Sequence, residues 1–132
     1  TALRYSPRSY VVRFDLRLPA CLDENDTAVI TRFVRALRLL LQKADDEKIR
    51  QGKRVHQHNL RFCWVREWGK EGRPHYHFAL MLNHDRYRTL GSFEEVEGNL
   101  SARIKQAWAT ATHQTFQDAS RLDLIQYFWT PR

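Results

Sequence analysis

The pattern of apolar and polar positions divides the chain into strands and helices. In residues 10–19 the apolar side chains occupy every second position, which is the period of a half-buried strand. In residues 29–41 they recur every three or four positions, as on one face of a helix. We predict that this helix continues to about Arg50 and ends near Gly52. Its candidate N-terminal capping residues are Asp23, Asn25, Asp26 and Thr27.

The middle of the chain predicts a β-hairpin. One strand-like run spans residues 60–66 and is closed by Glu67, and a second, almost continuously apolar run spans residues 75–82. The segment between them, residues 68–74, contains two glycines and a proline, which favour a turn. Because successive side chains of a strand point to opposite faces, His75 and His77 are expected to share one face.

The remaining elements complete a fold prediction. Residues 100–111 show helical spacing and are predicted to form a second amphipathic helix, capped by Asn99 or Ser101. The final run, residues 122–129, fits a strand or a helix. The order strand, helix, hairpin, helix and last element predicts an α+β fold, with an antiparallel sheet and helices packed on it in a ferredoxin-like topology. We expect residues 1–132 to form one domain.

Composition narrows the range of partners. Lys and Arg number 22 against 15 Asp and Glu, for a net charge of +7, which favours a polyanion such as nucleic acid, although a basic enzyme is the alternative. The two cysteines, Cys21 and Cys63, are too few and too far apart for a thiolate cluster or a disulfide framework, so we expect a reducing cytoplasm. No run approaches the roughly 18 apolar residues that a membrane helix needs, so no membrane partner is expected.

The predicted hairpin also brings together candidate metal ligands. If Glu67 pairs with His75, their Cβ atoms lie about 5 Å apart, and His77 lies on the diagonal at about 7–8 Å. One carboxylate and two imidazoles suit Mg²⁺ or Mn²⁺ as the working ion, with Zn²⁺ or Ni²⁺ as surrogates, and leave positions open for a substrate oxygen. Glu71 or Asp15 is an alternative third ligand, or Asp15, in a strand that faces the hairpin, orients a ligating imidazole. The other interpretation is two hydrogen-bonded histidines without metal.

Basic and aromatic residues surround the same turn. The candidates for phosphate contacts are Arg66, Lys70 and Arg73. Trp68 is the best candidate for stacking on an unpaired base, whereas Trp64 and Trp108 lie on apolar stripes and are expected in the core. A solvated hairpin tip explains the cations almost as well. Arg32, Arg35 and Arg38 fall largely off the apolar stripe of the first helix and are most simply its solvated face.

These motifs together resemble a known superfamily. A His-Tyr-His triplet inside an apolar strand, with an acidic residue one hairpin earlier, resembles the HUH nucleases, which include rolling-circle replication initiators, relaxases and related transposases. More narrowly, residues 12–19, 64–77 and 102–108 resemble the replication-protein domain of inovirus-type filamentous phages and related prophages. The triplet His56-Gln57-His58 has no apolar strand around it, so the combination of motifs carries the resemblance.

The resemblance implies a metal-dependent endonuclease that nicks and joins single-stranded origin DNA during rolling-circle replication, with a host or phage helicase as partner. His75, His77 and Glu67 would hold a divalent ion that polarises the scissile phosphate. A tyrosine would attack phosphorus and leave a 5′-phosphotyrosyl link beside a free 3′-hydroxyl. Family members usually carry this tyrosine on a helix as Tyr-x-x-Lys, and none of the five tyrosines here is followed by lysine at that spacing.

The departure from the pattern leaves the nucleophile open. Tyr127 is the only candidate by position, although it is also explained as a tyrosine of the core or its rim. The nucleophile otherwise lies outside this chain, which would then be truncated at its C-terminus. A second function class is therefore a DNA-binding module, for origin recognition or regulation, that keeps the fold and lacks the nucleophile. A metal-dependent hydrolase of small molecules is a third, less favoured class.

Overall fold

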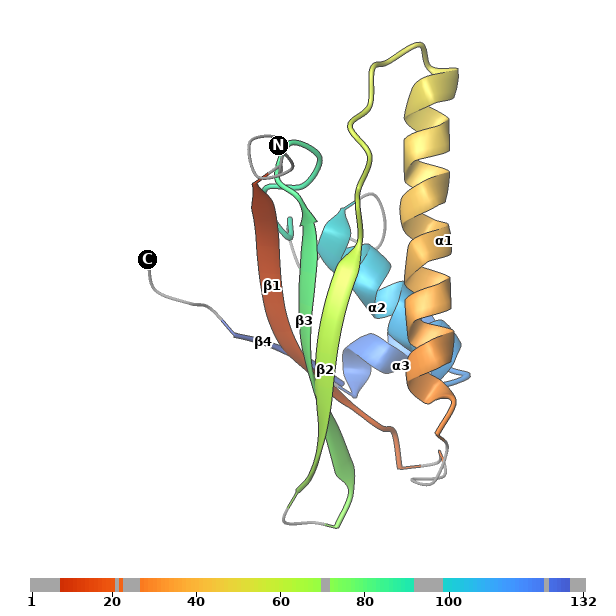
Figure 1. Ribbon diagram of the computed structural model, residues 1–132. Helices are drawn as coiled ribbons and strands as arrows, with labels where there is room; N and C mark the ends of the chain where they lie inside the picture. Colours follow the sequence, from red (N-terminus) through yellow and green to blue (C-terminus); the bar gives the residue numbers. More distant parts are fainter. Residues whose placement is uncertain are drawn as a thin grey trace.

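The protein folds as a four-stranded antiparallel sheet with its helices packed on one side, in the strand order β2-β3-β1-β4 (Figure 1). This computed structural model describes residues 8–20, 22, 27–69, 72–91, 99–122 and 124–128. The elements are β1 (Ser9–Arg17), α1 (Val29–Arg50), β2 (Arg61–Trp68), β3 (Pro74–Asn83), α2 (Leu100–Ala111), α3 (Phe116–Arg121) and β4 (Ile125–Phe128). The predicted α+β class with helices on an antiparallel sheet is confirmed.

The sheet has two unlike faces. Even-numbered residues of β1 and β3, such as Phe14 and Phe78, are buried against the helices, and their rings stack with centroids 5.7 Å apart. Phe33 of α1 meets both rings edge-on. We call this side the covered face. The opposite side, the open face, carries the odd-numbered residues of β1, β2 and β3 and the even-numbered residues of β4.

Helix α1 follows the predicted apolar stripe and ends as predicted. After Arg50 the chain turns at Gly52, whose φ of +77° favours glycine. The N–H groups of Gly52 and Lys53 donate to the carbonyl oxygens of Ile49 and Lys48, which satisfies two of the last carbonyls of the helix. At the start, Ala28 occupies the cap position without a side-chain hydrogen bond; of the predicted caps, Thr27 lies in a turn, and Asp23, Asn25 and Asp26 lie outside the described residues.

The hairpin has the predicted register. Glu67 of β2 stands opposite His75 of β3, and Val65 stands opposite His77. The connecting turn includes Gly72 at a φ of +77°, a conformation that costs glycine little. Among the described strands, β2 pairs only with β3 and is therefore an edge strand, whereas β1 lies in the interior of the sheet between β3 and β4.

The C-terminal part resolves what the pattern left open. Asn99 caps α2 by accepting the N–H of Ala102 at 2.8 Å. The final run forms the short strand β4 beside β1. Helix α3 was not predicted: its six residues carry too little apolar periodicity, although Thr115 caps it by accepting the N–H of Asp118. None of the helices in the described ranges is long and apolar enough to cross a membrane.

Candidate functional site

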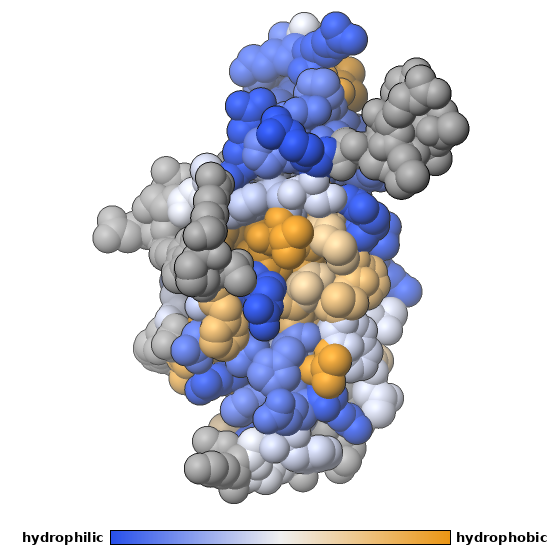
Figure 2. Space-filling model, turned by 60° about the vertical axis from the view of Figure 1, so that its left-hand side comes forward, coloured by the Kyte–Doolittle hydropathy of each residue, from blue (hydrophilic) through white to orange (hydrophobic). Residues whose placement is uncertain are grey.

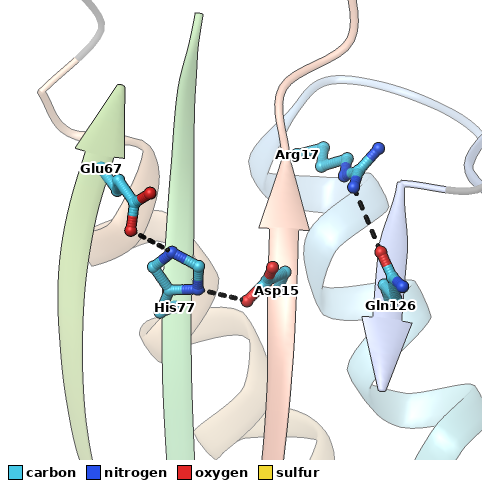
Figure 3. Close-up of polar contacts among 5 residues, drawn as sticks. All are labelled: Asp15, Arg17, Glu67, His77 and Gln126. Carbon is cyan, nitrogen blue, oxygen red and sulfur yellow. Dashed lines mark hydrogen bonds and ion pairs between the residues drawn. The ribbon is translucent and has the colours of Figure 1, made fainter. Parts of the chain in front are cut away.

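Three polar side chains from three adjacent strands meet on the open face. His77 of β3 lies at the centre, with Nδ1 at 2.5 Å from Asp15 Oδ1 and Nε2 at 2.9 Å from Glu67 Oε2 (Figure 3). Asp15 is the direct register partner of His77 in β1, and Glu67 reaches it diagonally from β2. We call Asp15, His77 and Glu67 the triad.

When both carboxylates of the triad are ionised, their contacts with His77 require a positive charge on the ring or beside it. Ionised carboxylates only accept hydrogen bonds. Two states of His77 therefore allow both of its ring nitrogens to lie next to a carboxylate. Either both nitrogens carry hydrogen, as an imidazolium, or Nδ1–H donates to Asp15 and a cation lies between Nε2 and Glu67. The second state is the arrangement of a metal-ligating histidine whose far nitrogen donates to a carboxylate.

The surroundings of His77 agree with a charged or cation-bound state. Burial alone lowers the pKa of His77, but the hydrogen bonds and negative charges of Asp15 and Glu67 outweigh burial and raise the pKa above its ordinary value. The side chain of Asp15 is 9% exposed, that of His77 41% and that of Glu67 69%. The buried Asp15 therefore holds the ring in place, while Glu67 and His77 Nε2 face solvent, where a ligand can approach.

The donor set fits a divalent ion at Nε2. In octahedral coordination with bonds of about 2.1 Å, adjacent ligand atoms lie about 3.0 Å apart, which is close to the 2.9 Å between His77 Nε2 and Glu67 Oε2. His75 shares the open face and stands opposite Glu67. In the described part of the chain, no group of three or more His, Cys, Asp or Glu side chains converges on one point as a preformed metal site. One reason is that Asp15 and Glu67 occupy opposite nitrogens of the same ring.

Some of the residues predicted to bind metal contact His77, and others do not. It brings Glu67 to His77, although the sequence expected its closest partner to be His75. It places Asp15 against the imidazole, as the sequence proposed for an orienting residue. Glu71, an alternative ligand, lies outside the described residues. The second triplet is off the sheet, and the ring of His58 there accepts the N–H of Leu60 at 3.1 Å.

The predicted DNA contacts are scattered. Arg66 and Trp68 lie on the helix side of β2, with the guanidinium 5.4 Å from the indole centroid. Arg73 donates to the carbonyl oxygens of Pro19 and Leu22, so it ties the hairpin to the segment after β1. Lys70 lies outside the described residues.

Three packing expectations were also tested. Trp108 is fully buried, as predicted. The prediction of a core position for Trp64 is wrong, because this residue lies at the edge of the sheet and is 43% exposed. Arg32 is not simply on a solvated face, because its Nε donates to the carbonyl oxygen of Ala111.

The described tyrosines do not lie near the triad. Tyr127 projects to the covered face, where its ring lies 5.7 Å from that of Phe14, and burial raises its pKa well above the ordinary value. Tyr10, Tyr76 and Tyr87 also lie in or against the core. Tyr5 lies outside the described residues. The structure therefore does not bring Tyr127 to His77.

Two open-face residues were missed by the sequence reasoning. Arg17 is the register partner of His75, Gln126 is that of Asp15, and Arg17 Nη2 donates to Gln126 Oε1 at 3.1 Å (Figure 3). The signal for Arg17 was present, because residues 15 and 17 of a strand share a face. Gln126 could not be placed, because the final run was ambiguous.

The open face mixes cations with exposed apolar side chains. Val65 is 65% exposed and Val11 is 53% exposed. Arg13 of β1 lies on the same face. Figure 2, which brings the left-hand side of Figure 1 forward, shows apolar side chains gathered within a hydrophilic surround.

All elements that build the triad lie within a region that matches a known family. The model of the YagK/YfjJ C-terminal domain matches residues 1–129. The chain belongs to the YagK/YfjJ C-terminal domain family. This YagK/YfjJ domain is 33% identical over 114 residues to the uncharacterized protein YagK of Escherichia coli K12, covering 80% of the chain and 54% of YagK. It is also 33% identical over 116 residues to the uncharacterized protein YfjJ of the same strain, covering 78% of the chain and 55% of YfjJ.

The chain thus spans about half the length of the curated relatives it matches. No solved structure matches this chain significantly. The names of both relatives state no activity, so membership in the YagK/YfjJ family leaves function to be argued from the geometry of the site.

Proposed function

We propose that this domain is a divalent-metal-dependent endonuclease that nicks and joins single-stranded DNA, as in rolling-circle replication. The observation that carries the proposal is the bonding of one imidazole, His77, to a buried carboxylate on one nitrogen and an exposed carboxylate on the other. Asp15 fixes the ring so that Nε2 and Glu67 face the same point in solvent. This division between an orienting and a ligating carboxylate is typical of metal sites.

The residues of the open face then have separate roles. His77 and Glu67 hold the ion, with His75 as the third protein ligand. When bound, Mg²⁺ or Mn²⁺ (or Zn²⁺ or Ni²⁺ as a surrogate) acts as a Lewis acid on the scissile phosphate. Arg17, on the same face opposite His75, is positioned to hold a non-bridging phosphate oxygen through its planar guanidinium.

The chain topology supports the finer assignment of a ferredoxin-like, HUH-type fold. Among the described residues, one helix lies between β1 and β2, a hairpin joins β2 to β3, and two helices lie between β3 and β4. With the order β2-β3-β1-β4, this sequence of elements is consistent with a β-α-β-β-α-β arrangement that carries one additional short helix, which supports the proposed assignment. The His-Tyr-His triplet lies on β3, next to the two strands that supply its carboxylates.

The nucleophile in this proposal is a tyrosine hydroxyl, which attacks phosphorus, forms the 5′-phosphotyrosyl ester and releases the 3′-hydroxyl. The geometry gives no support to Tyr127, which faces the core on the other side of the sheet. Tyr127→Phe tests the remaining assignment within the described residues: cleavage and adduct formation by this variant refute Tyr127 as the nucleophile.

A second candidate function is a DNA-binding module for origin recognition or regulation. The observation that favours it is that Tyr10, Tyr76, Tyr87 and Tyr127 all pack in or against the core. In this case the triad has a structural role or binds metal without cleavage.

A nicking assay distinguishes the two functions. The wild-type chain is mixed with a labelled single-stranded origin oligonucleotide and Mn²⁺, and products are separated under denaturing conditions. We expect a shortened strand and a covalent protein–DNA adduct, both lost in His77→Ala. The matched control, His56→Ala, removes an exposed histidine off the sheet and should cleave normally. DNA that is bound but uncut supports the binding module, and equal cleavage by His77→Ala refutes the assignment of the triad.

A further inference from the structure

The edge strand β2 carries a row of aromatic and cationic side chains on its helix side. The row consists of Phe62, Trp64, Arg66 and Trp68, which alternate with the open-face residues of the same strand. Trp64 is 43% exposed and Trp68 is 51% exposed, whereas Trp108 in the core is fully buried. Large apolar rings left in water at one edge of a sheet are typical of a binding surface.

A groove lies between this row and α1. It has a volume of about 420 Å³ and is open to solvent. Its lining includes Ile30, Val34, Arg35, Arg38, Phe62 and Trp64. Two threonines complete the lining, which is otherwise apolar, aromatic and cationic, and none of the described residues that line it is acidic. The arginines come from α1, which Figure 1 shows running beside β2.

The cations are held next to the rings. The guanidinium of Arg38 lies 5.9 Å from the centroid of Phe62, and that of Arg66 lies 5.4 Å from the centroid of Trp68. The ring of Trp64 is supported from below by Tyr76, which it meets at 61° with centroids 5.9 Å apart. Such contacts hold the side chains in place while their outer surfaces stay in solvent.

We propose that this groove, together with the exposed ring of Trp68 four residues further along β2, binds single-stranded DNA. Unpaired bases stack on Trp64 and Trp68, and Arg35 and Arg38 hold phosphates. The proposal rests on the proposed function for the identity of the ligand, but it uses a surface on the other side of β2 from the triad. Aromatic rings beside arginines match the alternation of bases and phosphates in a single strand. A duplex fits less well, because its bases are stacked on each other and their faces are not accessible.

The spacing of the tryptophans suits a strand that runs along β2. Positions 64 and 68 are four residues apart, which is about 13 Å along a β-strand. This length accommodates several nucleotides between the two rings. Glu67 lies between them in sequence and points to the open face, so DNA bound in the groove is led along the edge of the sheet toward the triad.

The test uses fluorescence anisotropy to measure the binding of a labelled oligothymidylate, without metal and at several salt concentrations. The oligonucleotide has about 15 nucleotides, which is within the site sizes of known single-strand binders. The variants are Trp64→Leu and Arg35→Gln/Arg38→Gln. The matched control is Arg50→Gln/Arg54→Gln, which removes two exposed charges, the first about 18 Å along α1 from Arg38. Melting curves of each variant verify folding, and Trp64→Phe serves as a conservative ring replacement.

We expect Trp64→Leu to weaken binding by about ten-fold or more, with Trp64→Phe close to wild type, because one stacked base contributes roughly this much. We expect Arg35→Gln/Arg38→Gln to reduce the slope of log K against log salt by about 1.4, since each phosphate contact to a single strand contributes about 0.7. The control should leave this slope unchanged.

Three results with the oligothymidylate overturn the inference: no binding by the wild type, equal binding by Trp64→Leu, or an equal loss of slope in the control. Tighter binding of duplex DNA or of an acidic peptide overturns it as well. None of these outcomes decides the metal-dependent cleavage, which depends on His77 and is measured separately. Conversely, metal-independent binding that requires Trp64, without any cleavage, upholds the groove and refutes the endonuclease.

Discussion

The indole of Trp108 donates its N–H to the main-chain carbonyl oxygen of Arg17 at 2.9 Å. Trp108 is fully buried in α2, and the N–H of Arg17 donates to the carbonyl oxygen of Leu124 just before β4. The end of β1 is therefore held from two directions by elements far away in sequence. This bonding fixes the backbone from which Arg17 extends over the open face, two residues after Asp15.

Replacement of Trp108 by phenylalanine should be costly for this reason. It removes the donor to Arg17 and leaves part of the indole volume empty, so we expect the free energy of unfolding to fall by about 2–4 kcal/mol. Urea denaturation followed by circular dichroism measures this change. Trp64→Phe, at the half-exposed edge position, should change stability by less than about 1 kcal/mol. Equal losses in the two variants would mean that the bond to Arg17 contributes nothing.

Asp15 should act on metal binding through His77. Asp15→Asn keeps the shape of the side chain but weakens its hold on the Nδ1–H, and loss of such a partner typically lowers metal affinity by about 10–100-fold. Titration with Mn²⁺ or Zn²⁺ by calorimetry measures the affinity. Asp46→Asn, on the exposed surface of α1, should bind metal like the wild type. Unchanged affinity in Asp15→Asn would remove the orienting role.

A buried ion pair connects α1 to the segment after β3. Arg86 Nε lies 2.7 Å from Asp45 Oδ1, with the side chains 9% and 6% exposed. Arg86→Met should lower the free energy of unfolding by about 3–5 kcal/mol, because it leaves a buried carboxylate without its partner. Arg50→Met, which breaks the exposed pair with Glu47, should cost less than about 1 kcal/mol. The double variant Asp45→Leu/Arg86→Met should lose less than the sum of its single changes, and strict additivity contradicts this coupling.

His58 should make stability depend on pH. Burial is the main cause that lowers its pKa below the ordinary 6.5; the charges of Arg38 and Arg86 lower it further, and that of Asp45 opposes them. The unfolded chain therefore takes up a proton before the folded protein does. Stability is full above pH 6.5 and falls as the pH drops from there through the folded pKa of His58, below which it levels off.

His58→Gln isolates this contribution. Urea midpoints are measured between pH 7.5 and pH 5 for both proteins, and the wild type should lose more stability over this range than the variant. The difference between the two curves cancels the other titrating groups, including His77. Parallel curves would show that His58 titrates alike in the folded and unfolded chain.

The sequence predicted those parts of the site that depend on short-range rules. The turn between residues 68 and 74 set the hairpin register, and strand alternation placed His75 and His77 on one face. It could not predict that Glu67 bonds His77 rather than His75, because side-chain reach along a diagonal depends on the twist of the sheet and on the position of Asp15. The role of Asp15 itself depended on strand order, which alternation does not define.

Errors arose where distant segments meet. Trp64 was expected in the core from its apolar neighbours, but β2 is an edge strand that α1 covers incompletely. Arg73 was expected to face DNA, and it binds the carbonyl oxygens of the segment after β1 instead. Tyr127 could not be assigned to a face until its strand and its partner Phe14 were known. In each case the deciding neighbour lies far along the chain.

Asp15, His77 and Glu67 come from three separate strands, so they come into contact only when these three strands are in the correct register. A slip of β1 by a single residue would replace the carboxylate with Phe14 or Leu16 and turn the acid toward the helices. A misaligned chain therefore has no place to hold an ion. If the site cuts DNA, this dependence is a built-in safeguard: a partly folded nuclease is an inactive one.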